Sequence, residues 1–245
     1  MRAFGLIGKK LGHSFSKKYF TEKFEKEGIT EAGYELYELA SVEELPALLN
    51  QNQNLVGLNV TVPYKEAVIP FLDQVDAAAA RIGAVNTIKI VNGHTTGFNT
   101  DYIGFRDSLL EFYSVKGMSR ALVLGTGGAS KAVCTALSDL AIPFKLVSRK
   151  ASAAAISYEA ITPALLREYD LIINTTPLGM QPDINTVPPL PYEALTSQHY
   201  LYDLVYNPER TKFLENGSRA GAHIKNGLDM LYRQAEAAWS IWNGA

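Results

Sequence analysis

Cysteine and histidine are both scarce in this sequence, and no segment is apolar enough to cross a bilayer. Cys134 is the only cysteine, so the chain has no internal disulfide and does not depend on an oxidising compartment. The histidines at positions 13, 94, 199 and 223 form no HExxH or similar ligand pair, so we expect no bound metal. Without a signal peptide or a long apolar run, the expected compartment is the cytoplasm.

A marked excess of charge of either sign is also missing. The formal net charge is −2 and the isoelectric point is near 6.1, which gives no electrostatic reason to expect a nucleic acid or an anionic membrane as a partner. With 47% apolar and 20% charged residues, the composition is that of a globular protein rather than a disordered one. The 245 residues suffice for one large domain or two smaller ones.

The chain is organised around residues 56–65, VGLNVTVPYK. Apolar residues alternate with smaller or more polar ones from Val56 to Val62, which predicts a strand, and Pro63 ends that strand and favours the first turn of a helix. Thr61 and Lys65 therefore stand at the carboxyl end of a strand, the edge at which open α/β sheets bind ligands. Lys65 is a candidate proton donor or acceptor, although this stretch taken alone favours a solvated lysine on a turn.

Before this stretch, residues 3–7 predict a short strand, and a helical pattern runs from Ser16 to Ile29. Ser16 is well placed to cap the N-terminus of that helix. Ser14 and Ser16 together, with free amides and the positive end of the helix dipole behind them, also suit a carboxylate ligand. The segment leaves both interpretations open.

Strands and helices then alternate in the order that is typical of a parallel sheet. We expect strands at 34–39 and 55–62 and helices at 42–49, 65–72 and 77–80.

Two polar residues flank a predicted hairpin. Its strands lie at 84–91 and 94–98 and are joined by Asn92-Gly93, the strongest short hairpin signal. Asn86 is unusual in a strand, because asparagine is depleted there, and such a local violation often marks a site. Asp101 begins the helix that follows, and is either its N-cap or a functional carboxylate.

From residue 119 the pattern becomes that of a dinucleotide-binding unit, with a strand at 120–124, a glycine-rich turn, a helix at 131–140 and a strand at 144–147. The turn reads Gly125-Thr126-Gly127-Gly128-Ala129-Ser130. Gly125 permits the tight turn, while Gly127 and Gly128 let backbone amides approach a pyrophosphate. Ser130 takes the place of the third glycine of the usual motif.

The end of the second strand of this unit indicates which dinucleotide binds. NAD-binding folds have an acidic residue about twenty residues beyond the first glycine, where it contacts the ribose hydroxyls. This sequence has Ser148, Arg149 and Lys150 there, with two cations and no acid. A guanidinium pairs with phosphate and stacks on adenine, so this set suits a 2′-phosphate and favours NADP.

The rest of the chain continues the same alternation. We expect strands at 170–174, 200–206 and 224–227, a proline-rich loop at 181–191 and a helix at 212–219. A final helix has an apolar stripe from Leu228 to Trp242, and Gln234 lies beside that stripe.

Seven motifs in this order resemble the shikimate dehydrogenase family, and the resemblance covers nearly the whole chain. They are residues 12–16 (GHSFS), 59–65 (NVTVPYK), 83–87 (GAVNT), 97–101 (GFNTD), 125–130 (GTGGAS), 174–180 (NTTPLGM) and 226–234 (NGLDMLYRQ). The family usually has prolines where this chain has Lys10 and Lys17, so we expect a less rigid serine loop, and the chain is short for the family.

The resemblance implies an α/β fold of two α/β domains. An N-terminal mixed-sheet substrate domain, residues 1–101, would be completed by the C-terminal helix, residues 227–245, and a Rossmann-like NADP-binding domain would occupy residues 102–226. The implied reaction is reversible hydride transfer between NADP and the C3 carbon of shikimate, giving 3-dehydroshikimate, in aromatic amino acid biosynthesis. The sequence leaves open whether the enzyme is a monomer or a homodimer.

The resemblance also implies roles for individual residues. Lys65 and Asp101 match the catalytic pair, and Ser14 and Ser16 would hold the substrate carboxylate. The ring hydroxyls would be bound by Thr61, Asn86, Asp101 and Gln234. NADP would be bound by Gly125 to Ser130 together with Ser148, Arg149 and Lys150. The nicotinamide and the substrate cleft would be bordered by Thr175, Tyr206, Gly227 and Met230.

Three other functions remain possible at this point. A quinate/shikimate dehydrogenase using NAD is disfavoured by the paired serines and by Arg149. A tetrahydrofolate-type dehydrogenase shares only a lysine and a glycine-rich turn with this sequence. A non-catalytic dinucleotide-binding regulator on the same scaffold would have no need of both Lys65 and Asp101.

Overall fold

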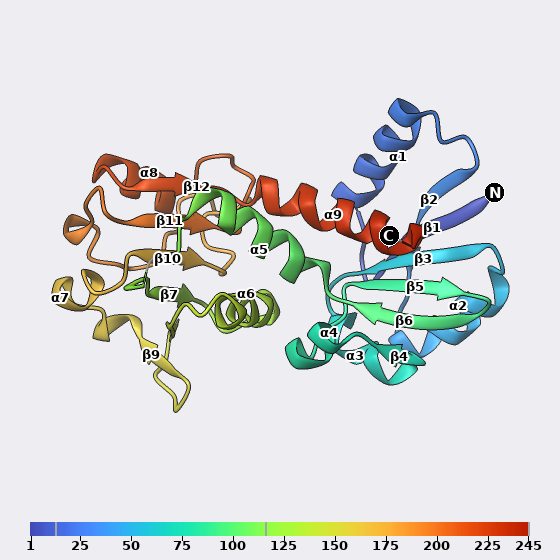
Figure 1. The fold of residues 1–245 in the computed structure, drawn as a ribbon, viewed down its shortest axis with the longest axis horizontal. Coiled ribbons are helices and arrows are strands. Elements are labelled where there is room, and N and C mark those ends of the chain that lie inside the picture. The colour runs from blue at the N-terminus through green and yellow to red at the C-terminus, as the bar shows by residue number, and fades with distance from the viewer. Residues whose placement is uncertain (13, 116, 245) are drawn as a thin grey trace. The chain divides into compact units, whose positions relative to one another are not determined.

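The computed structural model describes residues 1–12, 14–115 and 117–244, and the chain divides into two compact units (Figure 1). Unit 1 contains Met1–Thr100 and Gln234–Ala245, and unit 2 contains Asp101–Arg233. Each unit has its own sheet and its own apolar core.

Unit 1 has a mixed sheet, six-stranded within the described residues. Its strands are β1 (Arg2–Gly8), β2 (Ala32–Glu38), β3 (Leu55–Val60), β4 (Gln74–Val75), β5 (Thr87–Val91) and β6 (His94–Phe98). They lie in the order β2-β1-β3-β5-β6-β4. Strand β1 pairs in parallel with β2 and β3, whereas β5 runs antiparallel to β3 and β6.

Helices cover this sheet and join its strands. They are α1 (Phe15–Glu27), α2 (Leu45–Gln51), α3 (Tyr64–Ala67), α4 (Ala77–Ile82) and α9 (Leu228–Asn243), with 3₁₀ turns η1 (Val42–Glu44) and η2 (Ile69–Phe71). The hairpin β5–β6 turns at Asn92 and Gly93, both at positive φ (51° and 78°), as expected for the predicted Asn-Gly turn (Figure 1).

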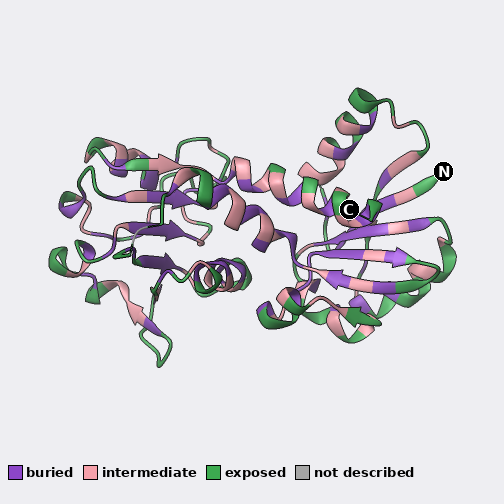
Figure 2. Cartoon of the chain, viewed as in Figure 1, coloured by how far each residue is buried: buried purple, intermediate pink, exposed green. Residues whose placement is uncertain are grey.

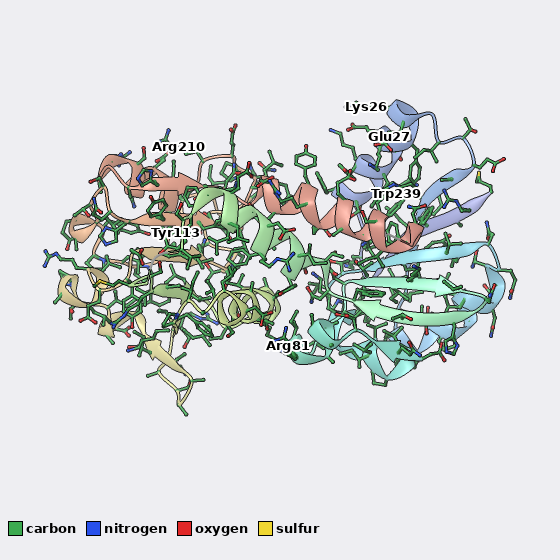
Figure 3. All side chains as sticks on the ribbon, in the orientation of Figure 1. Lys26, Glu27, Arg81, Tyr113, Arg210 and Trp239 are labelled. Atoms are coloured by element: carbon green, nitrogen blue, oxygen red, sulfur yellow. The ribbon has the colours of Figure 1, made fainter. Side chains whose placement is uncertain are left out.

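An aromatic cluster fixes α9 against the sheet of unit 1. The ring of Trp242 on α9 lies 5.0 Å, between centroids, from Phe4 of β1 and 5.3 Å from Phe20 of α1. The indole nitrogen of Trp242 donates to the carbonyl of Ile88 at 2.9 Å. A Cβ at Gly57 would lie 2.4 Å from the indole, so only glycine leaves room for it. Trp239 belongs to the same cluster (Figure 3).

Unit 2 has a parallel sheet, also six-stranded within the described residues. Its strands are β7 (Ala121–Leu124), β8 (Phe144–Ser148), β9 (Ala155–Ser157), β10 (Leu171–Asn174), β11 (Tyr200–Asp203) and β12 (His223–Lys225). The order β9-β8-β7-β10-β11-β12 is the 3-2-1-4-5-6 order of the doubly wound dinucleotide-binding fold. The central strands β7 and β10 are buried throughout, which explains their uninterrupted apolar sequences (Figure 2).

The helices of unit 2 either precede β7 or connect the strands of this sheet. They are α5 (Thr100–Phe112), α6 (Gly128–Asp139), α7 (Pro163–Leu166) and α8 (Lys212–Arg219), with 3₁₀ turns η3 (Tyr158–Ala160) and η4 (Tyr192–Ala194). Among the described residues, no helix is both long and apolar enough to cross a membrane.

The predicted fold class, two α/β domains with a mixed and a Rossmann-like sheet, is confirmed. Several predicted element boundaries are wrong. Strand β3 ends at Val60 and leaves Val62 72% exposed. The helix predicted at 65–72 is split into α3 and η2, because Pro70 has no amide hydrogen to continue an α-helix. The short strands β4 and β9 carry no clear sequence signal, so the prediction lacks them.

Candidate functional site

Three motif segments of unit 1 meet at one end of its sheet. The amide of Val60, the last residue of β3, donates to the carbonyl of Asn86 at 2.9 Å. The amide of Val85 donates to the carbonyl of Lys65 at 2.7 Å. The amide of Asn86 donates to the carbonyl of Phe98, at the end of β6, at 3.0 Å. The backbone therefore fixes Lys65, at the start of α3, beside Asn86.

Asn86 does not belong to a strand, contrary to the prediction. It immediately precedes β5 and is 3% exposed. Its side-chain oxygen accepts from the amide of Thr100 at 2.7 Å and lies 3.2 Å from the hydroxyl of Thr100. The same hydroxyl lies 3.4 Å from Oε1 of Gln234, which is 8% exposed on α9. Thr100 thus joins Asn86 to Gln234, two of the predicted substrate-binding residues.

The serine loop also differs from the prediction in its cap. The N-cap of α1 is Ser14, which has extended dihedrals and accepts from the amide of Lys17 at 3.3 Å. Because α1 begins at Phe15, Ser16 lies inside the first turn and is not the N-cap. His13, within the same motif, lies outside the described residues.

Thr61 and Asp101 each stand at the end of an element. The amide of Thr61 donates to the carbonyl of Ile7 at 2.9 Å, and a Cβ at Gly8 would lie 2.7 Å from the methyl group of Thr61. Asp101 lies in the first turn of α5, which begins at Thr100, so it is not the N-cap of that helix. Lys65, Thr61 and Asp101 are all half-buried.

In unit 2 a cavity of about 480 Å³ lies at the carboxyl ends of the strands. It is lined by Gly125, Thr126, Gly127, Ser148, Arg149, Tyr158, Thr175, Thr176, Pro177 and Leu178. These residues lie at or just after the ends of β7, β8, β9 and β10, and the cavity opens where the strand order reverses between β7 and β10. In doubly wound sheets that position binds the dinucleotide.

The loops after β7 and β10 are packed directly on each other. Gly125 has φ of 109°, and a Cβ there would lie 2.7 Å from the hydroxyl of Thr175. That hydroxyl donates to the carbonyl of Leu124 at 2.7 Å. Glycine is therefore required at position 125 both for its dihedral and for space.

The residues around the cavity fit a dinucleotide that carries a 2′-phosphate. A Cβ at Gly127 or Gly128 would meet no protein atom within 4 Å, so the N-terminus of α6 is open to a pyrophosphate. Arg149 and Lys150 are exposed, and no carboxylate of the described residues pairs with either. The hydroxyl of Tyr158 is buried without a hydrogen-bond partner, and burial raises its pKa.

Five other residues that were predicted to bind the cofactor or border the cleft range from buried to exposed, and their contacts differ accordingly. Ser130 is 3% exposed and donates its hydroxyl to the carbonyl of Gly127 at 2.6 Å, so its side chain braces the glycine loop. Met230 is buried on α9. Tyr206 is 39% exposed. Gly227 packs so closely on the carbonyl of Leu204 that a Cβ would lie 2.2 Å from that oxygen. The hydroxyl of Ser148 donates to the carbonyl of Lys150 and orders the turn after β8.

Sequence reasoning missed the residues that support these loops. Tyr158 lies on a short 3₁₀ turn that has no periodic signal. The side chain of Asn174 accepts from the amide and hydroxyl of Thr176 and donates to Asp203 at 2.9 Å, which sets the course of the cavity wall at 176–178. Asn174 ends a buried apolar strand. A polar residue is unusual there, as Asn86 is in its predicted strand, so the sequence could have marked Asn174 as a candidate site residue.

Within the described parts of the chain, no group of three histidine, cysteine, aspartate or glutamate side chains is arranged to hold a metal ion.

Comparison with known proteins identifies the relatives of this chain. The profile of the shikimate dehydrogenase substrate binding domain matches residues 6–88. A shikimate dehydrogenase (NADP(+)) of Caldanaerobacter subterraneus subsp. tengcongensis is 37% identical over 266 residues, which covers 99% of this chain and 92% of that protein. The chain belongs to the shikimate dehydrogenase family.

Solved structures of the family extend the similarity to the whole fold. The shikimate 5-dehydrogenase of Thermus thermophilus, in complex with NADP(H) and shikimate, is 34% identical with a TM-score of 0.86, and the match covers 100% of this chain and 94% of that one. The quinate dehydrogenase of Corynebacterium glutamicum, in complex with NAD, is 28% identical with a TM-score of 0.88 over 100% and 94%. The shared fold thus serves more than one substrate and cofactor.

Proposed function

We propose that this protein catalyses the reversible, NADP-dependent oxidation of shikimate to 3-dehydroshikimate, a step of aromatic amino acid biosynthesis. The observation that carries the proposal is the similarity, over 99% of the chain, to a protein named shikimate dehydrogenase (NADP(+)). The exposed cations Arg149 and Lys150 beside the unit 2 cavity support the choice of NADP over NAD.

The proposed substrate residues belong mainly to unit 1. Ser14 and Ser16, at the N-terminus of α1, would bind the carboxylate of shikimate, because serine hydroxyls and the positive end of a helix both favour an anion. The ring hydroxyls would be bound by Thr61, Asn86, Asp101 and Gln234, with Tyr206 as a further contact. The buried hydrogen bonds of Asn86 and Gln234 support this assignment, since they hold both amides in fixed orientations.

The proposed cofactor residues belong to unit 2. Thr126, Gly127, Gly128 and Ala129 would present backbone amides to the pyrophosphate, Gly125 would form the tight turn before them, and Ser130 would brace their loop. Ser148, Arg149 and Lys150 would bind the 2′-phosphate. Thr175, Gly227 and Met230 would border the nicotinamide. NADP, when bound, accepts or returns a hydride at its nicotinamide ring.

Lys65 and Asp101 are the proposed catalytic pair. Oxidation of a secondary alcohol requires a base that takes the hydroxyl proton while the carbon loses a hydride, and the reverse reaction requires the same group as an acid. Lys65 would take and return that proton. Asp101 would bind the same hydroxyl and orient Lys65.

A Lys65→Ala variant tests this role. General acid–base catalysis contributes about 10²- to 10⁴-fold, so kcat should fall by about that factor while the protein remains folded. Thermal unfolding and NADP binding serve as controls, because a variant that stays folded and binds NADP has lost only the chemical step. A variant that keeps most of its kcat would contradict the assignment.

Further parts of the proposal come from the sequence and its resemblance to the family. They are a substrate domain of residues 1–101 with 227–245, an NADP domain of residues 102–226, a cytoplasmic location, and a monomer or homodimer. The division into units at Thr100 and Gln234 supports the two-domain scheme.

A second candidate function is oxidation of quinate with NAD. The structural similarity to a quinate dehydrogenase in complex with NAD favours it. Quinate carries an additional hydroxyl beside its carboxylate, so it would have to fit against Ser14 and Ser16.

A further inference from the structure

A buried carboxylate lies next to the strand that leads into the wall of the unit 2 cavity. Asp203, the last residue of β11, is in register with Asn174, the last residue of β10. Both side chains are fully buried, at 0% exposure. Because the two strands are parallel neighbours, the paired side chains leave the sheet on the same face. The side-chain nitrogen of Asn174 donates to Oδ1 of Asp203 at 2.9 Å.

The carboxylate of Asp203 is surrounded by hydrogen-bond donors. Besides Asn174, the hydroxyl of Thr211 donates to Oδ2 at 2.5 Å and the amide of Val205 donates to Oδ1 at 3.0 Å. Within the described residues, no lysine, arginine or histidine forms an ion pair with it. Burial raises the pKa of Asp203 to about 6, so the group is ionised at pH 8. A buried charge without a cation is costly, and such a group often marks a functional position.

The charge of Asp203 decides which way the amide of Asn174 lies. A carboxylate only accepts hydrogen bonds, whereas a carboxamide has a donor end and an acceptor end. Asn174 therefore turns its nitrogen to Asp203, and its oxygen faces the loop that follows β10. That oxygen accepts from the amide of Thr176 at 3.1 Å and from the hydroxyl of Thr176 at 2.6 Å.

Thr176 carries this orientation into the cavity wall. Its hydroxyl oxygen accepts from the amide of Leu178 at 3.3 Å, and the carbonyl of Leu178 lies 3.4 Å from the side-chain nitrogen of Asn174. Thr176, Pro177 and Leu178 all line the cavity. The position of this wall thus depends on a carboxylate that does not itself line the described part of the cavity.

We propose that Asp203 is a positioning residue for NADP: its buried carboxylate fixes the amide of Asn174, which holds Thr176 and with it the cavity wall at 176–178. The inference rests on the proposed function, because it takes NADP as the ligand of this cavity. It predicts that Asp203 affects the affinity for NADP, and neither stability nor the affinity for shikimate, whose proposed ligands belong mainly to unit 1.

The test is Asp203→Asn, which keeps the shape of the side chain and removes its charge. One amide oxygen replaces two carboxylate oxygens although all three neighbours donate, and neutral hydrogen bonds are about half as strong as charge-assisted ones. The Kd of NADP at pH 8, measured by isothermal titration calorimetry without shikimate, should rise about three- to tenfold. KM for shikimate at saturating NADP should change less than about twofold.

Thermal stability separates positioning from a structural role. Asp203→Asn no longer buries a charge, so its melting temperature at pH 8 should equal or exceed that of the wild type. Tyr113→Phe is the matched control. Tyr113 is 1% exposed, and its hydroxyl donates to Asp170, immediately before β10, at 2.5 Å (Figure 3). This control should lower the melting temperature and change the Kd of NADP less than about twofold.

A double-mutant cycle tests the route through Asn174. Thr176→Val removes the hydroxyl that Asn174 holds at 2.6 Å. In the Thr176→Val background, Asp203→Asn should raise the Kd of NADP less than about twofold, because the bond through which the carboxylate acts is absent.

Specific outcomes overturn the inference. An unchanged Kd of NADP in Asp203→Asn does so, and so do additive effects with Thr176→Val. An Asp203→Asn protein that does not fold, or that loses stability together with NADP affinity, also overturns it and assigns Asp203 a structural role. These outcomes leave the proposed function intact if the wild-type protein oxidises shikimate. A wild type that binds NADP without oxidising shikimate contradicts the proposed reaction alone, whereas one that does not bind NADP overturns both.

Discussion

The exposed cations at the end of β8 allow a quantitative prediction about cofactor choice. Arg149 lines the unit 2 cavity, and no carboxylate of the described residues neutralises it. A charge-assisted hydrogen bond contributes about 1.5–3 kcal/mol. Because Arg149 is solvent-exposed, screening reduces this to about 1–2 kcal/mol, which corresponds to a factor of about 5 to 30 in affinity.

Arg149→Ala should therefore lower kcat/KM with NADP by about 5- to 30-fold. With NAD, which lacks the 2′-phosphate, only stacking on adenine is lost, and kcat/KM should fall by no more than about threefold. The assay is the initial rate of nicotinamide reduction with saturating shikimate and each cofactor in turn.

Arg167→Ala is the matched control for this experiment. Arg167 is also exposed and without an ion-pair partner among the described residues, but it lines a different cavity, with Arg120 and Asp170 at the amino ends of the strands. Its removal changes the net charge equally and should alter neither cofactor's kcat/KM. An equal fall with NAD and NADP in Arg149→Ala, or no fall at all, would refute the reasoning.

Two further predictions concern unit 2. Gly128→Ala should leave thermal stability unchanged or slightly raised, since the added Cβ meets no protein atom within 4 Å. The same variant should increase KM for NADP, because the Cβ would stand where the pyrophosphate approaches. By contrast, Gly227→Ala should lower the melting temperature, because its Cβ would lie 2.2 Å from the carbonyl oxygen of Leu204. Equal melting temperatures for these two variants would count against the packing argument. Burial raises the pKa of Asp203 to about 6, although Thr211, Val205 and Asn174 donate to it. Because the folded pKa exceeds the unfolded one, the unfolding free energy should fall as the pH rises from about 4 to 6, by up to about 3 kcal/mol relative to Asp203→Asn. Denaturant titrations at several pH values measure this difference, and parallel pH profiles for the two proteins would contradict it.

The features that the sequence predicted best are those fixed by local chemistry. The Asn92-Gly93 turn requires positive φ at both residues, and the doubly wound order of unit 2 follows from strands and helices that alternate around a glycine-rich turn. The prediction of the helix N-cap was wrong where two neighbouring residues both suited that position. Ser14 and Ser16 are both good N-caps, and in the structure Ser14 takes that role because α1 begins at Phe15.

Residues that act through tertiary contacts could not be found in this way. Tyr34 lies in an ordinary strand, and nothing near it in the sequence indicates that its hydroxyl donates to the side chain of Asn59. Asn59 carried a usable signal, because an amide in a buried strand needs a partner, as Asn86 does. Tyr158 reaches the cofactor cavity from a 3₁₀ turn whose position depends on the packing of the whole sheet.

The most direct test of the proposed function compares shikimate and quinate as substrates, each with NADP and with NAD. Initial rates of nicotinamide reduction by the wild-type protein give four values of kcat/KM. We expect the value for shikimate with NADP to exceed the other three by far, because the serine loop and Arg149 favour that pair. Comparable rates with quinate or NAD would assign the protein to the broader quinate/shikimate class, and an absence of turnover with every pair would contradict an enzymatic function.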